Sequence, residues 1–305
     1  MSSIILPRLP AYGLRLQHEN PLGLPKSGTP PSLKRRLPDR SPISGVAKVV
    51  AVSSAKGGVG KSTVAGKSEH ISNLSLAFAR QGYRTGILDT DIFGPSIPTL
   101  FNLSGEPRLS QNNQLIPMSN YGVKTMSMGY LVPEGQAVAW RGLMVGRALT
   151  QLLRDVAWDG LDVLVMDLPP GTGDIQLSIA QQVVVDGAVV VTTPHTLAVQ
   201  DAVRGIQLFR KANVPLLGVV QNMSVFCCPG CNKETHIFGT GEGVAKACAD
   251  LDTTLLADIP LHPCIGDDAQ RGKPTVVAEP ESGRAAAFLK LAEDIAATIG
   301  LSAQK

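Results

Sequence analysis

A Gly-rich stretch in the first quarter of the chain limits the possible folds more than any other feature. Residues 56–63 read KGGVGKST and directly follow the apolar run at 49–52. An apolar strand, a Gly-rich turn and a helix that begins at Lys-Ser-Thr are the parts of a phosphate-binding P-loop. The glycines let backbone N–H groups surround an anion, and the helix dipole adds to the attraction. We therefore predict that this stretch binds a nucleoside triphosphate.

Two side chains of this loop have defined tasks. Lys61 would contact the β- and γ-phosphates, and the Ser62 hydroxyl would bind Mg²⁺. The first glycine of the usual eight-residue pattern is replaced by Ala55, and a second lysine, Lys56, lies inside the loop. The residues that we expect to contact the nucleotide are Gly57, Gly58, Val59, Gly60, Lys61, Ser62 and Thr63.

The chain after residue 45 alternates between short apolar runs and longer stretches with helical periodicity. The apolar runs lie near 47–53, 85–89, 123–127, 161–167, 187–193, 216–221 and 255–259. The helical stretches lie near 141–156, 174–184, 197–212, 240–250 and 284–299. This alternation predicts an α/β protein with the three-layer P-loop NTPase fold, in which helices cover both faces of a mostly parallel sheet. Ligands of such sheets bind at the carboxyl ends of the strands.

The beginning of the chain has a different composition. Its first 45 residues contain seven Lys or Arg, two acids and eight prolines. A basic, acid-poor segment is typical of mitochondrial import, and a disordered basic arm is the alternative. We expect residues 1–44 to be a presequence and disordered linker, residues 45–300 the ATPase domain with its cysteine site, and residues 301–305 a tail. The predicted location is the mitochondrial matrix.

Composition also argues against two kinds of partner. A net charge of +3 is too small to argue for nucleic-acid binding. No apolar run reaches the roughly 18 residues that a membrane helix needs, so we expect no integral membrane segment.

Residues 66–72 (GKSEHIS) separate the P-loop from an Asn-x-x-Leu-Ala helix face at 73–77. Seven residues make nearly two helical turns, so a helix that continues through them keeps its face in register. We interpret residues 66–72 as an insertion or as an error in the predicted gene.

Acidic residues follow two of the apolar runs. Asp89 and Asp91 come at the end of one run, and we expect Asp91 to position the attacking water with support from Asp89. A helix-capping role for Asp91 is the alternative. Asp167 ends another run in the Walker B pattern and would approach Mg²⁺. Gly171, in the Pro-Pro-Gly-Thr-Gly turn that follows, would lie near the γ-phosphate and move on hydrolysis.

The choice of base rests on weaker signals. Asn222 follows the run at 216–221 and could contact the edge of adenine. Asn232-Lys233-Glu234-Thr235 resembles a guanine-binding motif but lacks its aspartate. ATP is therefore the favoured nucleotide.

The cysteines suggest a metal. Cys228 and Cys231 form a Cys-x-x-Cys pair, a spacing that lets two thiolates bind one metal. An iron–sulfur cluster, zinc and a redox dithiol all remain open. A tetrahedral thiolate site needs four ligands, and a symmetric homodimer would supply them from two pairs. We interpret Cys227 as a bystander, and Cys248 and Cys264 as structural thiols.

Several segments taken together resemble the Mrp family of P-loop ATPases, whose members are scaffolds or carriers of iron–sulfur clusters. The segments that carry this resemblance are residues 56–63, 89–96, 140–142, 167–174 and 222–224. Residues 223–226 before the cysteine pair and 235–239 after it most resemble the mitochondrial branch, which delivers clusters for assembly of respiratory complex I.

The resemblance implies roles for individual residues. Lys56 looks like the signature lysine of the deviant Walker A class, which reaches the partner's nucleotide across a dimer. Cys228 and Cys231 would bind a labile [4Fe–4S] cluster that bridges two subunits. Slow ATP hydrolysis would alter the dimer and so favour loading or release of the cluster into apoproteins, including complex I subunits.

Two other classes of protein share the deviant loop. Spatial regulators of cell division or plasmid partition need a membrane-binding tail helix or a basic DNA-binding face, and a Cys pair has no purpose there. An adaptor with structural zinc or no metal belongs to the same alternative. Iron proteins of the nitrogenase type use two widely separated cysteines, whereas this chain has a close pair.

Overall fold

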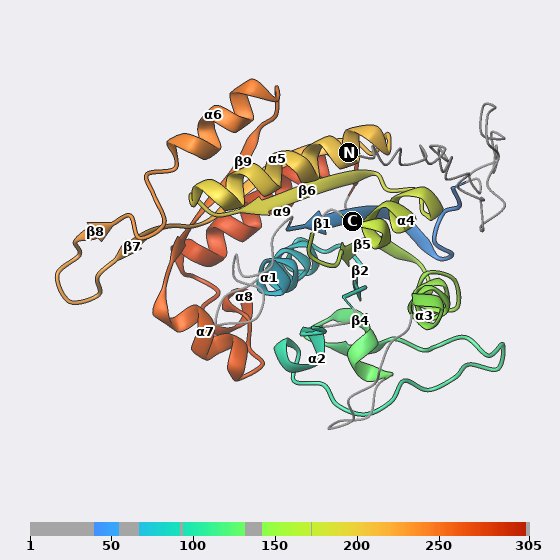
Figure 1. Cartoon of the computed structure of the whole chain (residues 1–305). Coiled ribbons are helices and arrows are strands. Elements are labelled where there is room, and N and C mark those ends of the chain that lie inside the picture. Colours follow the sequence, from blue (N-terminus) through green and yellow to red (C-terminus); the bar gives the residue numbers. More distant parts are fainter. Residues whose placement is uncertain (1–39, 55–66, 92–93, 132–141, 172, 303–305) are drawn as a thin grey trace, which may run out of the picture. The chain divides into compact units, whose positions relative to one another are not determined.

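One sheet organises the part of the chain that the computed structural model describes, namely residues 40–54, 67–91, 94–131, 142–171 and 173–302. Its strands lie in the order β3-β4-β2-β5-β1-β6-β7-β8, and β9 pairs with β7 (Figure 1). Only β3 and β8 run antiparallel to their neighbours within this sheet. The strands are β1 Val46–Ser53, β2 Thr85–Asp89, β3 Met118–Asn120, β4 Val123–Ser127, β5 Leu161–Asp167, β6 Gly187–Thr192, β7 Leu216–Cys227, β8 Glu234–Thr235 and β9 Leu255–Leu261.

Helices cover both faces of this sheet, and β1 shows how its sequence allows this. Successive side chains of a strand point to opposite faces. Val49 and Ala51 belong to a core shared with α3, α4, α5 and α6, whereas Val50 and Val52 belong to a second core with α1, α2, α8 and α9 (Figure 1). The helices are α1 Lys67–Arg80, α2 Ile97–Leu100, η1 Met128–Tyr130, α3 Gly142–Arg154, α4 Asp174–Gln182, α5 Thr196–Lys211, α6 Glu242–Asp250, α7 Pro263–Gln270, α8 Thr275–Ala278 and α9 Gly283–Ile299.

The predicted three-layer α/β fold is confirmed. Each of the seven apolar runs is a parallel strand, and each of the five helical stretches is a helix. Most of the elements that the periodicity did not predict are short, such as α2, α8, β3 and β8, because four residues or fewer show no clear period. The eight-residue helix α7 is also absent from the prediction. Strand β7 is longer than predicted, since it does not end at residue 221 but continues to Cys227.

Helix α1 includes most of residues 66–72, the segment interpreted as an insertion. It begins at Lys67 and runs without interruption to Arg80. Ile71, Leu74 and Phe78 are all buried and share one face, so residues 67–72 extend the helix in register with the residues that follow. Whether residues 66–72 are an insertion stays a prediction.

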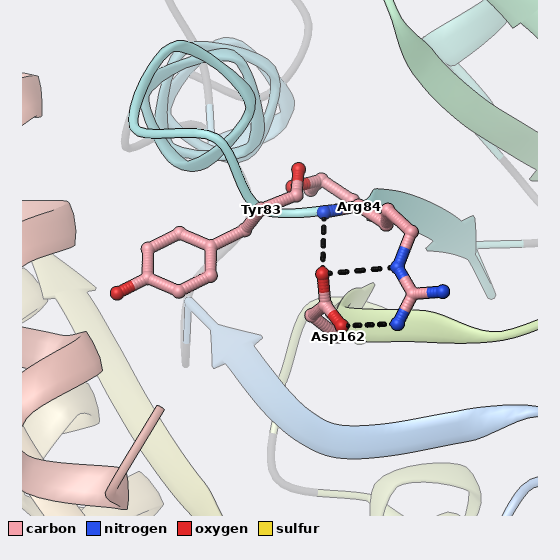
Figure 2. A network of polar contacts seen from close by, with 4 residues as sticks. Tyr83, Arg84 and Asp162 are labelled. Atoms are coloured by element: carbon pink, nitrogen blue, oxygen red, sulfur yellow. Dashed lines mark hydrogen bonds and ion pairs between the residues drawn. The ribbon is translucent and has the colours of Figure 1, made fainter. Parts of the chain in front are cut away.

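The turn between α1 and β2 is tied to the sheet by one carboxylate (Figure 2). Asp162 of β5 accepts hydrogen bonds from the Arg84 backbone N–H at 2.8 Å and from its guanidinium nitrogens Nε and Nη2 at 3.2 and 2.6 Å. These bonds hold the pKa of Asp162 below its usual value, despite its partial burial. Among the described helices, none is long and apolar enough to span a membrane.

Candidate functional site

Three predicted site residues meet at the carboxyl ends of two neighbouring strands. Asp89 on β2 and Asp167 on β5 are direct partners in the parallel ladder. Asp91 follows two residues after Asp89, and all three side chains are at most 1% exposed. β1, which leads toward the P-loop, pairs with β5 on its other side and places Val52 opposite Asp167. The sheet thus gathers the acidic residues beside the end of β1.

Asp89 is held by several donors. Its Oδ1 accepts the Asp91 N–H at 3.0 Å, and its Oδ2 accepts the Ser127 hydroxyl at 3.0 Å and the Ser96 N–H at 3.2 Å. Burial, with a smaller contribution from the charge of Asp167, raises the pKa of Asp89 to about 7, although the Ser127 and Ser96 hydrogen bonds act in the opposite direction. A cation placed between these two carboxylates would relieve their repulsion.

Backbone contacts fix the loop after β5. The backbone N–H of Thr90 donates to the carbonyl of Asp167 at 3.0 Å, which joins the two acidic strand ends. The Gly171 N–H donates to the Ser54 carbonyl at 3.3 Å, so the loop lies against the end of β1. Gly171 therefore lies beside the chain that enters the P-loop, and its position near the γ-phosphate stays a prediction.

Gln176 is a polar residue of this region that the sequence analysis missed. It lies on α4, is 1% exposed, and its Nε2 donates to Ser53 Oγ at 3.1 Å and to the Pro169 carbonyl. Its amide therefore joins β1, α4 and the loop after Asp167. The sequence placed Gln176 two residues after Asp174, close to the predicted site. A glutamine at the start of a helix is ordinarily exposed, so the sequence did not indicate that it is buried there.

The predicted P-loop contacts lie outside the described residues, since the described chain stops at Ser54 and resumes at Lys67. The roles assigned to them stay predictions. They are Lys56, Gly57, Gly58, Val59, Gly60, Lys61, Ser62 and Thr63.

Asn222 lies at the carboxyl end of the parallel part of β7, as expected, but its side chain points into the protein. It is 2% exposed, and its Oδ1 accepts the Met223 N–H at 2.9 Å. His70 of α1 hydrogen-bonds with the same side chain. A contact between Asn222 and adenine stays a prediction.

The cysteine pair lies at the tip of the hairpin formed by β7 and β8. Cys227 pairs with Glu234 at the last step of this ladder. The turn then closes through bonds from the Cys228 N–H to the Lys233 carbonyl at 3.1 Å and from the Asn232 N–H to the Cys228 carbonyl at 2.8 Å. The tip is open to solvent, since Cys228 is half-buried and Cys231 exposed.

The turn brings the two predicted thiols together and favours the thiolate of one. Backbone N–H groups of Gly230 and Cys231, and the Cys231 thiol, point at the Cys228 sulfur and lower its pKa. Among the described residues, no third His, Cys, Asp or Glu joins this pair to form a metal site. One chain thus presents two thiols, and a tetrahedral thiolate site needs four.

Comparison with known proteins agrees with this geometry. The family model described as NUBPL iron-transfer P-loop NTPase matches residues 45–296. The mouse protein named iron-sulfur cluster transfer protein NUBPL is 49% identical over 265 residues, which cover 86% of this chain and 81% of that protein. The Escherichia coli K12 iron-sulfur cluster carrier protein is 46% identical over 266 residues, which cover 87% and 70% of the two chains.

Solved structures share the fold. A nucleotide-binding protein from Archaeoglobus fulgidus, solved in complex with ADP, is similar with a TM-score of 0.67 and 33% identity, over 81% of this chain and 93% of that one. The cell division ATPase MinD from Pyrococcus furiosus is similar with a TM-score of 0.58 over 82% and 98% of the two chains. Its identity of 21% makes it evidence for the fold alone.

Proposed function

Because this chain belongs to the NUBPL iron-transfer family of P-loop NTPases, we propose that it is an ATP-dependent scaffold and carrier of iron–sulfur clusters. The observation that carries the proposal is the hairpin turn that holds Cys228 and Cys231 together at an exposed tip. A carrier must expose its cargo to the recipient, and a thiol pair at a protruding turn meets that need. The cluster is cargo here, held for transfer.

The cluster that fits this arrangement is [4Fe–4S], bound between two subunits. Such a cluster takes four thiolates, and each chain offers one pair. A homodimer with the two hairpins on its symmetry axis supplies the full set. The lowered pKa of Cys228 favours the deprotonated ligand that iron requires.

Nucleotide binding is assigned to the P-loop and the acidic strand ends. Lys61 would contact the β- and γ-phosphates, and Lys56 would reach the nucleotide of the partner subunit. Ser62 and Asp167 would hold Mg²⁺, which would neutralise phosphate charge when bound. The buried Asp89 and Asp167 suit this cation, because their adjacent carboxylates repel each other without one. Asp91, supported by Asp89 and next to the Gly171 loop, would orient the attacking water.

The recipients that we propose are apoproteins of mitochondrial respiratory complex I, and the proposed location is the mitochondrial matrix. Two features support this. The composition of residues 1–44 is typical of an import sequence. The chain also shares 49% identity with a eukaryotic protein that is named for cluster transfer.

Anaerobic reconstitution with iron and sulfide tests the proposal. The full chain should take up about four irons per dimer with the absorbance of a [4Fe–4S] cluster. Cys228→Ala with Cys231→Ala should abolish the uptake, whereas Cys248→Ala should not, because Cys248 is buried on α6 away from the hairpin. Zinc binding at the pair without iron uptake would instead favour the alternative function, an ATPase in which the two thiols bind a structural zinc ion.

The nucleotide cycle has its own test. Lys61→Ala should lower ATP hydrolysis and impair cluster transfer in cells, because the β- and γ-phosphates lose their cationic contact. The measurement is complex I content in cells that carry the variant. Normal complex I content in such cells would contradict a required nucleotide cycle.

A further inference from the structure

Strand β7 changes direction at Asn222 and Met223, shortly before its last pair with β9 at Phe226. Its pairing with β9 runs from Asn222↔Ile259 to Phe226↔Leu261, so four steps on β7 face two steps on β9. Met223 has φ +55°, in the left-handed region that a non-glycine residue rarely adopts. Extra residues of this kind bend a strand and aim the chain beyond them in a new direction.

Side chains from three directions hold this bend. The Asn222 Oδ1 accepts the Met223 N–H at 2.9 Å, a local bond that stabilises the unusual backbone. On the α1 side, His70 hydrogen-bonds with Asn222, and its ring lies 5.5 Å from that of Phe288 on α9. On the hairpin side, the Met223 side chain packs against Phe238 and Leu261.

The residues that directly follow the bend form the cysteine hairpin. Phe226 pairs with Thr235, and the Nδ1 of His236 lies 3.3 Å from the Ser224 carbonyl oxygen. The hairpin projects from the sheet in Figure 1, with the turn of Cys228 and Cys231 at its far end. The direction of this hairpin is therefore set at its base, by the bend and by the Phe226–Leu261 pair that follows it.

We propose that Asn222 and Met223 are positioning residues for the cysteine pair. The bend they form, with His70 behind it and Phe238 over it, aims the β7–β8 hairpin so that two copies of the chain can present four thiolates to one cluster. The inference about cluster geometry rests on the proposed carrier function. The inference about the direction of the hairpin rests on the fold alone.

Amide hydrogen exchange of the metal-free full chain tests the bend directly. Asn222→Ala removes the oxygen that holds Met223, and Phe238→Ala removes the packing over it without touching Asn222. Both variants should raise exchange in residues 223–235 by about tenfold or more and leave β5 unchanged. Asn222→Asp keeps an acceptor oxygen and should restore protection. The matched control, Ser224→Ala on the same buried stretch, should exchange like the wild type.

Iron uptake and nucleotide affinity are measured on the same proteins. They separate the inference about the direction of the hairpin from the inference about cluster geometry. Lower iron per dimer in Asn222→Ala and Phe238→Ala, with Asn222→Asp restored, supports the positioning role. Wild-type exchange in both alanine variants overturns it, as does a loss of ATP affinity in Asn222→Ala with an undisturbed hairpin. Faster hairpin exchange in a chain whose wild type takes up no iron would support the bend and reject the carrier function.

Discussion

His70 should make the folded protein less stable as the pH falls from 7 to 5. Its imidazole is buried in α1, and burial lowers its pKa from 6.5 to about 4, although a hydrogen bond with Asn222 acts in the opposite direction. The unfolded chain takes up a proton on this imidazole near pH 6.5, whereas the folded chain does so only near pH 4. The unfolded state therefore binds more protons between these values. As the pH is lowered from 7 to 5, the free energy of unfolding decreases by about 2 kcal/mol.

The variant that isolates this effect is His70→Phe, which keeps a ring against Phe288 and binds no proton. Urea unfolding at pH 7 and pH 5 gives the free energy of unfolding of both proteins. The wild type should lose about 2 kcal/mol relative to the variant between the two pH values. Buried carboxyls such as Asp89 titrate in both proteins and cancel in this difference. The free energies of unfolding of the two proteins differ by some amount at each pH. If this amount changes by less than about 0.5 kcal/mol between pH 7 and pH 5, His70 titrates in the folded chain as it does in water.

Two further predictions follow from the contacts of single side chains. Asp162→Ala should lower the free energy of unfolding by about 2 kcal/mol in urea titrations, because the Arg84 backbone N–H and guanidinium lose their shared acceptor. Asp201→Ala, which breaks an exposed ion pair on α5, should change it by less than about 0.5 kcal/mol. In the native metal-free chain, iodoacetamide should modify Cys228 well before Cys248, because burial raises the pKa of the Cys248 thiol. The rate of modification of each cysteine is measured by mass spectrometry of the modified peptides. Equal rates at Cys228 and Cys248 would contradict the prediction.

The sheet and its acidic edge could be predicted from the sequence for one physical reason. Parallel strands covered on both faces are nearly continuous apolar runs, so the runs that end at Asp89 and Asp167 stand out. Carboxyl ends of neighbouring parallel strands meet at one edge, so two acids at such ends must lie close together. The sequence did not predict the order of the strands. The structure shows that β2 and β5 are direct neighbours.

The inward orientation of Asn222 could not be predicted, because it depends on the backbone of the next residue. A methionine carries no signal for a left-handed conformation, so the sequence indicated a strand that ends at residue 221. The polar Asn-Met-Ser segment then resembled a loop that faces ligand. In the fold the same segment is buried at the base of a strand that continues to Cys227.

The two chemistries of this chain are therefore placed by different means. The acidic residues are held by the ladder between β2 and β5, which leaves little freedom in their separation. The cysteine pair lies at the end of a two-stranded extension that contacts the sheet through the Met223 bend and the Phe226–Leu261 pair, and a two-stranded hairpin has little stability of its own. His70 lies on α1, the helix that follows the predicted P-loop, and contacts that bend through Asn222. A displacement of α1 on nucleotide binding would act on the hairpin through the bend from which it extends.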